Sequence, residues 1–96
     1  MAHPNYTKGA RFERAVKADL ELMGCFVVRA GGSRGPADLV VLVAGRKPRL
    51  MACKVNGVLR PAERESLLLT AERAGATAWL VHRPVPGEIH YDRVKA

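Results

Sequence analysis

Apolar and polar residues follow a helical pattern in two parts of the chain and a β-strand pattern in several others. Residues 7–23 carry apolar side chains at helical spacing, with a threonine as N-cap and a helix stop at Gly24. A second helix is predicted from Pro61, a residue that suits a first helical turn, to about Gly75. The segment before the first helix, residues 1–6, is expected to be a flexible arm.

Four further segments have the composition of β-strands. Residues 26–30 are rich in β-branched and aromatic side chains, and residues 77–82 have the same character. Residues 37–44 form a continuous apolar run, as expected for a central strand that is buried on both faces. Residues 49–55 are predicted to pair back on that run through a hairpin turn at residues 45–48.

The predicted order of elements is α-β-β-β-α-β, with a short extra edge strand at residues 89–91. Two helices against one mixed central sheet form an α/β sandwich. The 96 residues are expected to form one domain, residues 1–96, with a modest core. The chain has no apolar run of the roughly 18 residues that span a bilayer. It also has no apolar signal segment, so we expect no membrane partner and a cytoplasmic location, which for a viral protein would be the host cytoplasm.

Composition adds one informative number, a net charge of +7. Residues 8–60 hold eleven basic and four acidic residues, whereas residues 61–96 hold five of each. A basic excess confined to one part of the chain favours nucleic acid as a partner over a surface that is basic for solubility alone. The two cysteines, Cys25 and Cys53, lie among apolar residues, so we expect reduced thiols rather than a disulfide or a zinc site.

Three charged residues form the candidate chemical site. Asp38 stands at the head of an apolar strand, where an unpaired carboxylate is costly to bury, and Lys54 ends the neighbouring strand. If the hairpin pairs as predicted, both side chains lie at one end of the sheet, within reach of Glu13 on the first helix. Metal-assisted phosphodiester cleavage requires carboxylates beside a lysine, because the metal activates a water and the lysine offsets developing charge. A plain salt bridge between Asp38 and Lys54 is the alternative.

The chain also resembles a known family. Its ordered motifs are similar to those of the archaeal-type Holliday junction resolvases, in the PD-(D/E)xK nuclease superfamily, over about residues 7–82. The motifs that carry the resemblance are Lys8-Gly9, Glu13-Arg14, Arg29, Gly32-Ser33, Asp38-Leu39-Val40 and Lys54. The resemblance implies a restriction-endonuclease-like α/β fold, with a mixed central sheet flanked by helices. It also implies a homodimeric endonuclease that nicks four-way (Holliday) DNA junctions, with Mg2+ as cofactor, Mn2+ as a substitute and no small-molecule cofactor.

One position departs from the family's pattern. The third strand of such nucleases reads Glu-x-Lys, whereas this chain has Ala52-Cys53-Lys54. The change removes a metal ligand, so the resemblance implies a form that binds DNA but is catalytically impaired. Because every other motif position is intact, we interpret Ala52 as a deliberate inactivating substitution rather than natural decay.

The resemblance assigns catalytic roles position by position. The catalytic set that it implies is Glu13, Asp38, position 52 (here Ala52) and Lys54. The metal ligands that it implies are Asp38, the residue at position 52 and the backbone carbonyl of Cys53. Glu13 would act on the metal through bound water, and Lys54 would be the catalytic lysine.

The expected DNA contacts come from two sources. The resemblance implies that Arg14, Arg29 and Ser33 hold the bound strand, and the charge pattern adds Lys8 and Arg34. Related nucleases often place a polar helper at the start of the second helix. We assign no role to the residues found there, which are Glu63, Arg64 and Glu65.

Two further features bear on partners. The triplet Leu67-Leu68-Leu69 is more apolar than one helix face needs, so this helix and the last strand are candidates for the two-fold interface. Trp79 is expected in the core or at that interface. Two alternative functions also fit: a non-catalytic DNA-binding module on a nuclease-like fold, which Ala52 favours, and a nuclease that nicks at specific sequences.

Overall fold

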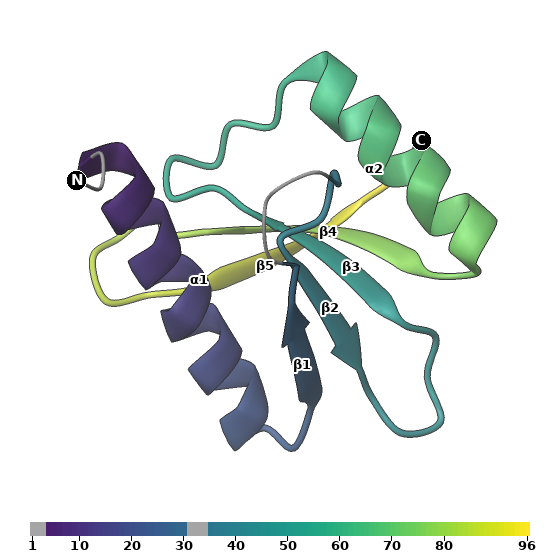
Figure 1. Cartoon of the computed structure of the whole chain (residues 1–96), viewed down its shortest axis with the longest axis horizontal. Helices are drawn as coiled ribbons and strands as arrows, with labels where there is room; N and C mark the ends of the chain where they lie inside the picture. Colours follow the sequence, from purple (N-terminus) through teal and green to yellow (C-terminus); the bar gives the residue numbers. More distant parts are fainter. Residues whose placement is uncertain (1–3, 31–34) are drawn as a thin grey trace.

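The computed structural model describes residues 4–30 and 35–96, with side chains from residue 9 onward (Figure 1). The order of elements is α-β-β-β-α-β-β, which confirms the predicted order and its extra edge strand. The elements are α1 (Pro4–Leu22), β1 (Phe26–Arg29), β2 (Leu39–Leu42), β3 (Arg49–Cys53), α2 (Pro61–Ala74), β4 (Thr77–His82) and β5 (His90–Val94).

The five strands form one mixed sheet in the order β1-β2-β3-β4-β5. Neighbouring strands are antiparallel except β3 and β4, which are parallel and are joined through α2. The predicted hairpin is therefore present, with Leu39 opposite Met51. A parallel pair needs a long crossover, so the chain leaves the end of β3, passes through α2 and returns to the start of β4. This crossover brings the first turn of α2 within reach of the residue that follows β3, since Glu63 pairs with Lys54.

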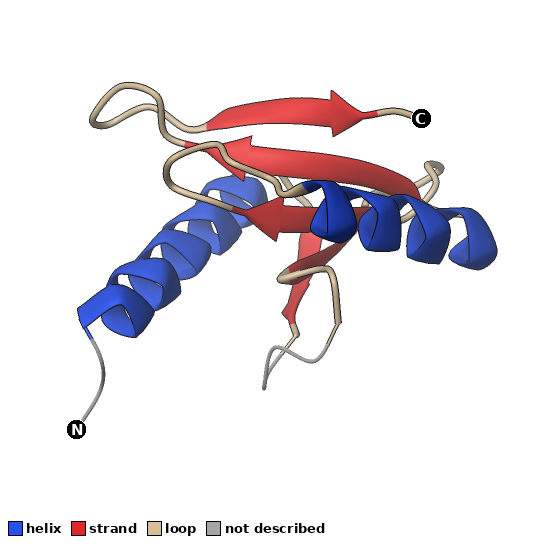
Figure 2. Ribbon diagram, turned by 90° about the horizontal axis from the view of Figure 1, so that it is seen from above, coloured by secondary structure: helices blue, strands red, loops and turns tan. Residues whose placement is uncertain are grey.

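The two helices cover opposite faces of the sheet, and Figure 2 shows the strands between them. Side chains alternate between the faces along each strand. On β3, Met51 belongs to the apolar cluster under α1, whereas Leu50 and Ala52 belong to the cluster under α2. The side chain of Lys54, two residues after Ala52, therefore lies on the face of the sheet that α2 covers.

The bounds of α1 differ from the sequence prediction. The helix begins at Pro4 rather than at Thr7, because proline suits a first helical turn and its fixed φ is already helical. Three residues of the predicted arm are therefore helical, and residues 1–3 lie outside the described part of the chain. The helix ends at Leu22, one residue before the predicted end.

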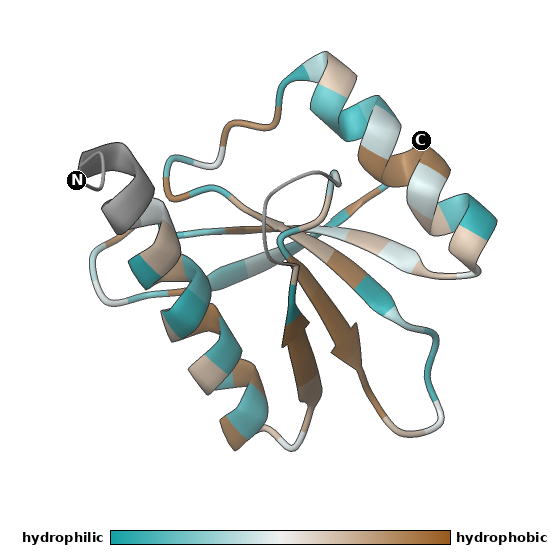
Figure 3. Ribbon diagram, in the orientation of Figure 1, coloured by the Kyte–Doolittle hydropathy of each residue, from teal (hydrophilic) through white to brown (hydrophobic). Residues whose placement is uncertain are grey.

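The prediction that residues 37–44 are buried on both faces was wrong for the outer part of the sheet. Strand β2 spans only Leu39–Leu42, and Leu42 is 43% exposed opposite Phe26, which is 65% exposed. The reason is tertiary. Helix α2 packs on β3 and β4, so Phe26 and Leu42, which are on the same side of the sheet as α2, are left uncovered. Figure 3 shows α2 lying away from β1 and β2. The edge strand β5 is longer than the predicted residues 89–91, since it pairs with β4 as far as Val94.

Two other expectations concern the cysteines and membranes. Cys25 and Cys53 are free thiols, and both are half-buried. None of the helices in the described ranges is both long and apolar enough to cross a membrane.

Candidate active site

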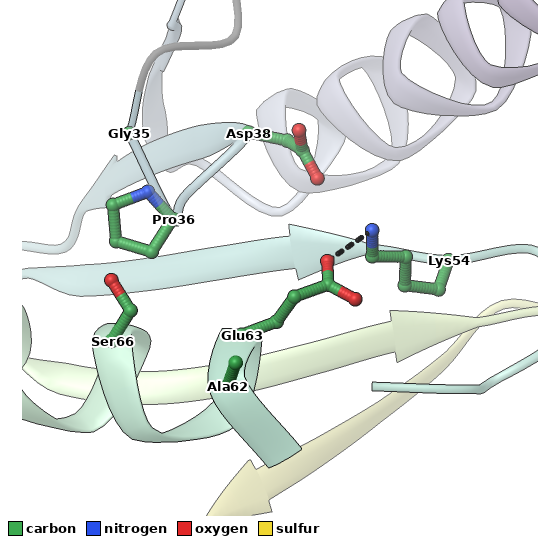
Figure 4. A pocket seen from close by; sticks show the side chains of 7 residues that line it. All are labelled: Gly35, Pro36, Asp38, Lys54, Ala62, Glu63 and Ser66. Atoms are coloured by element: carbon green, nitrogen blue, oxygen red, sulfur yellow. Dashed lines mark ion pairs between the residues drawn. The ribbon is translucent and has the colours of Figure 1, made fainter. Parts of the chain in front are cut away.

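Asp38 and Lys54 lie in one pocket, as the hairpin predicted. The pocket has a volume of about 500 Å³ and opens where β2 begins and β3 ends. The residues that line it are Gly35, Pro36, Asp38, Lys54, Ala62, Glu63 and Ser66. Figure 4 shows the side chains of Asp38, Lys54 and Glu63 pointing toward one another. The start of β2, the end of β3 and the first turn of α2 thus converge on one site.

Backbone hydrogen bonds fix Asp38 between two strands. Its N–H donates to the carbonyl of Met51 at 2.8 Å, and its carbonyl accepts from the N–H of Ala30 at 2.9 Å. Its carboxylate Oδ2 accepts a hydrogen bond of 2.7 Å from the backbone N–H of Cys53. The carboxylate therefore satisfies a part-buried donor at the end of β3 and is held beside residues 52–54.

Lys54 forms an ion pair with a residue that the sequence left without a role. Its Nζ lies 2.7 Å from Oε2 of Glu63, in the first turn of α2. Glu63 also accepts a hydrogen bond from the backbone N–H of Arg60, the residue before the helix. The hydrogen bond from Lys54 lowers the pKa of Glu63 below its ordinary value. The salt bridge between Asp38 and Lys54, the alternative considered from the sequence, is not formed between these described residues.

The sequence did contain a signal for Glu63. An acidic residue three positions after the N-cap is favoured there because it binds free backbone N–H groups at a helix start. The signal says that Glu63 begins a helix, but it does not say that the helix begins beside Lys54. That proximity comes from the crossover between β3 and β4.

Glu13 approaches the site from the other helix. One of its oxygens lies 3.5 Å from Nη2 of Arg29 on β1, and both side chains are only partly exposed. Burial raises the pKa of Glu13, the negative charge of Asp38 raises it further, and Arg29 and Arg14 act in the opposite direction. The carboxylates of Glu13 and Asp38 are therefore close enough to interact, although Glu13 does not line the pocket. The expected set of Glu13, Asp38 and Lys54 lies at one end of the sheet.

Two predicted phosphate-binding arginines are found around Glu13. Arg14 is exposed on α1, whereas Arg29 pairs with Glu13. The Nε of Arg29 is buried and has no hydrogen-bond partner within the described ranges. The other predicted DNA contacts cannot be placed in the same way, because the side chain of Lys8 and all of Ser33 and Arg34 lie outside the described residues.

Ala52 lies beneath α2 and is only 1% exposed. It packs in an apolar cluster with Leu67 and Ala71 of α2. The thiol of Cys53 is on the opposite face, against the cluster under α1, and burial raises its pKa. Of the three predicted metal ligands, only Asp38 offers a side-chain oxygen. Residues 9–30 and 35–96 contain no group of three His, Cys, Asp or Glu side chains arranged to hold a metal ion.

Comparison with known proteins identifies the family. The family model for archaeal Holliday junction resolvases matches residues 4–93 of this chain. Hjc from Archaeoglobus fulgidus, a Holliday junction resolvase from an archaeal hyperthermophile, has a similar structure, with a TM-score of 0.78 at 26% sequence identity. The similarity covers 91% of this chain and 73% of that protein, and it confirms the predicted restriction-endonuclease-like fold. No curated protein matches the sequence significantly. The chain therefore belongs to the archaeal Holliday junction resolvase family, whose members are junction-resolving nucleases.

Proposed function

We propose that this protein binds four-way DNA junctions as a homodimer and that its Ala52 form cuts them poorly or not at all. In the form with a glutamate at position 52, we propose symmetric nicking by metal-dependent hydrolysis. The observation that carries the proposal is the convergence of Asp38 and Lys54 in one pocket of a resolvase fold. The basic excess of residues 8–60 supports DNA as the partner. We place this activity in the cytoplasm.

The metal would be Mg2+, with Mn2+ as a substitute. Proteins usually hold Mg2+ through one or two carboxylates together with substrate phosphates. Asp38 and the carbonyl of Cys53 are the groups of this chain that would hold it, and Ala52 contributes no ligand. The residues present therefore fit a metal poorly, and we assign no cleavage step to this form. A glutamate at position 52 would share a face of β3 with Lys54 and would complete a carboxylate pair with Asp38.

Ala52→Glu tests the catalytic part of the proposal, with Ala52→Gln as a neutral control of the same length. All three forms should bind a labelled four-way junction in EDTA. With Mg2+ or Mn2+, only Ala52→Glu should produce paired nicks. Junction binding by Ala52→Glu without any nicking in either metal contradicts the catalytic assignment and favours a non-catalytic DNA-binding module.

A stability measurement tests metal binding without DNA cleavage. A second carboxylate near Asp38 is disfavoured by burial and by like charge, so Ala52→Glu should melt at a lower temperature than the unmodified chain in EDTA. Mg2+ binds only the folded site, so it should raise the melting temperature of Ala52→Glu and leave that of Ala52→Gln unchanged. Equal responses of the two variants to Mg2+ would contradict the proposed ligand set.

The substrate class needs a separate comparison. Junction DNA should compete for binding far better than linear duplex of the same length and sequence. Equal competition by the two DNA forms would favour the alternative of nicking at specific sequences.

The homodimer has a candidate interface on the open face of β1 and β2. Three exposed apolar side chains lie there, Phe26, Val28 and Leu42, with exposed fractions of 65%, 46% and 43%. Phe26 is opposite Leu42 in the sheet register, and Val28 lies two residues further along β1 on the same face. Figure 3 shows β1 and β2 coloured as mainly hydrophobic. Exposed apolar strips on small domains commonly mark interfaces. The predicted interface on α2 exposes less apolar surface. Leu67 is fully buried in the core of its own subunit, and Leu69 is 45% exposed.

Charged substitutions distinguish the two candidate interfaces. Leu42→Lys should convert the dimer to a monomer in sedimentation experiments, whereas Leu69→Lys should leave it intact. The reverse result would favour an interface on α2, and a monomeric unmodified chain would contradict the homodimer.

A further inference from the structure

A second pocket lies at the end of the sheet far from Asp38. It has a volume of about 310 Å³ and is lined by Arg46, Lys47, Arg49, Thr77, Trp79 and Arg93. We call these six residues the hairpin-end cluster. The turn between β2 and β3 supplies two cations, and β3 and β5 supply one each. The sheet register brings them together, since Arg49 is opposite Thr77 and Trp79 is opposite Arg93.

The four cations of this cluster lack negatively charged neighbours among the described side chains. Within residues 9–30 and 35–96, none of them has a carboxylate partner, whereas Lys17, Arg29 and Lys54 each have one. The nearest acidic residue in sequence, Asp92, pairs with His82 instead. Four uncompensated positive charges around one pocket favour a ligand with several negative charges.

The ring of Trp79 makes cation–π contacts with two of the arginines. The guanidinium carbons of Arg49 and Arg93 lie 5.2 Å and 5.9 Å from the centroid of its ring. The indole N–H donates to Oγ1 of Thr77 at 2.8 Å, which fixes the ring orientation. A guanidinium in cation–π contact with an aromatic ring can still donate hydrogen bonds from its N–H groups. The ring is thus already covered by cations, so the cluster suits phosphate oxygens better than a stacked base.

The cluster cannot be part of the Asp38 pocket. Arg49 and Lys54 are five residues apart along β3 and the turn after it, which separates them by about 16 Å at ~3.3 Å per residue. They also lie on opposite faces, because Arg49 shares the α1 face with Met51 and Lys54 shares the α2 face with Ala52. A DNA segment bound at Asp38 would therefore not reach the cluster without passing around the sheet edge.

We propose that the hairpin-end cluster binds the phosphate backbone of a duplex arm of the junction, away from the crossover point. This inference rests on the proposed junction binding and adds a second contact to it. Duplex DNA carries one negative charge per ~1.7 Å of its axis, so several phosphates can face four clustered cations at once. The contact reads phosphate positions and carries no base sequence.

The double variant Arg46→Ala/Lys47→Ala removes two cations from the exposed turn and leaves Arg49 and Arg93 in place beside Trp79. The matched control is Arg73→Ala/Lys95→Ala, which removes two exposed cations elsewhere. Junction affinity is measured over a range of salt concentrations, for junctions with arms of about two helical turns and for hairpin-closed junctions with arms of about half a turn. Melting temperatures show whether each variant is folded.

For the long-armed junction, Arg46→Ala/Lys47→Ala should reduce the slope of log affinity against log salt by about 2, since each lost phosphate contact contributes about 0.9. The slope for the short-armed junction and the slopes of the control should not change. Trp79→Leu should reduce the long-arm slope in the same direction, because it removes the ring that orients two arginines.

An unchanged long-arm slope for the folded double variant would overturn this inference and leave the proposed junction binding intact. An equal loss for both arm lengths would also overturn it, because the contact would then lie at the crossover. An unmodified chain that fails to bind any junction would overturn the proposed function and this inference together.

Discussion

Asp38 has a structural role that can be separated from its proposed chemistry. Its carboxylate accepts a 2.7 Å hydrogen bond from the part-buried backbone N–H of Cys53. Asp38→Ala leaves that N–H without a partner, whereas Asp38→Asn keeps an oxygen acceptor and removes only the charge. A hydrogen bond to a charged group contributes roughly 1.5–3 kcal/mol, against about 1 kcal/mol for a neutral one.

The expected losses are large for a chain of this size. Asp38→Ala should lower the free energy of unfolding by about 1.5–3 kcal/mol, and Asp38→Asn by about 1 kcal/mol. One kcal/mol shifts the melting temperature of a domain of up to about 100 residues by about 4–8 °C. The melting temperature should therefore fall by about 6–24 °C for Asp38→Ala and by about 4–8 °C for Asp38→Asn.

Thermal unfolding followed by circular dichroism measures both shifts. Glu65→Gln, which removes an exposed carboxylate from α2, serves as the control and should change stability by less than about 0.5 kcal/mol. Equal melting temperatures for Asp38→Ala and Asp38→Asn would refute the claim that this hydrogen bond holds the carboxylate in place. In an Ala52→Glu background, Asp38→Asn should also abolish nicking, and retained nicking would exclude Asp38 as a metal ligand.

Three other predictions follow from contacts around the site. Tyr91→Phe removes a 2.6 Å hydrogen bond from β5 to the carboxylate of Asp19 on α1, and urea unfolding should show a loss of about 1.5 kcal/mol; an unchanged free energy of unfolding would contradict the bond. The pKa of Glu63 is lowered, so its contribution to stability is present above pH 4.5 and is lost as the pH falls through the folded-state pKa. Lys54→Met should remove the loss of stability that accompanies protonation of Glu63. A carboxyl NMR titration should then show the pKa of Glu63 closer to its ordinary value, and a pKa that stays low would contradict the ion pair. The pKa of Glu13 is raised by burial and by Asp38, so its contribution favours the folded state below pH 4.5 and that advantage declines as the pH rises through the folded-state pKa. Asp38→Asn should lower the pKa of Glu13 in the same titration, and an unmoved pKa would show that the two carboxylates do not interact.

Much of the architecture could be predicted from local patterns. The ends of α2 are marked by Pro61 and by Gly75, whose φ of +65° suits glycine. The hairpin between β2 and β3 follows from breakers between two apolar runs, and it places Asp38 near Lys54. These features depend on residues close together in the sequence, where periodicity and turn chemistry act directly.

Tertiary structure decided the partners of the charged side chains. Lys54 pairs with Glu63 because the crossover from β3 to β4 sets the start of α2 against the end of β3. Leu42 is exposed because α2 covers β3 and β4 and does not extend over the end of β2. The pattern of residues 37–44 contains no information about the position of α2.

The basic surface gives the clearest contrast. The sequence by itself determined that positive charge is concentrated in residues 8–60, because net charge depends only on composition. The hairpin-end cluster nevertheless takes Trp79 and Arg93 from the neutral part of the chain, since β4 and β5 pair beside β3. Which charges act together depends on distance in space, and strand pairing sets that distance for residues far apart in the sequence.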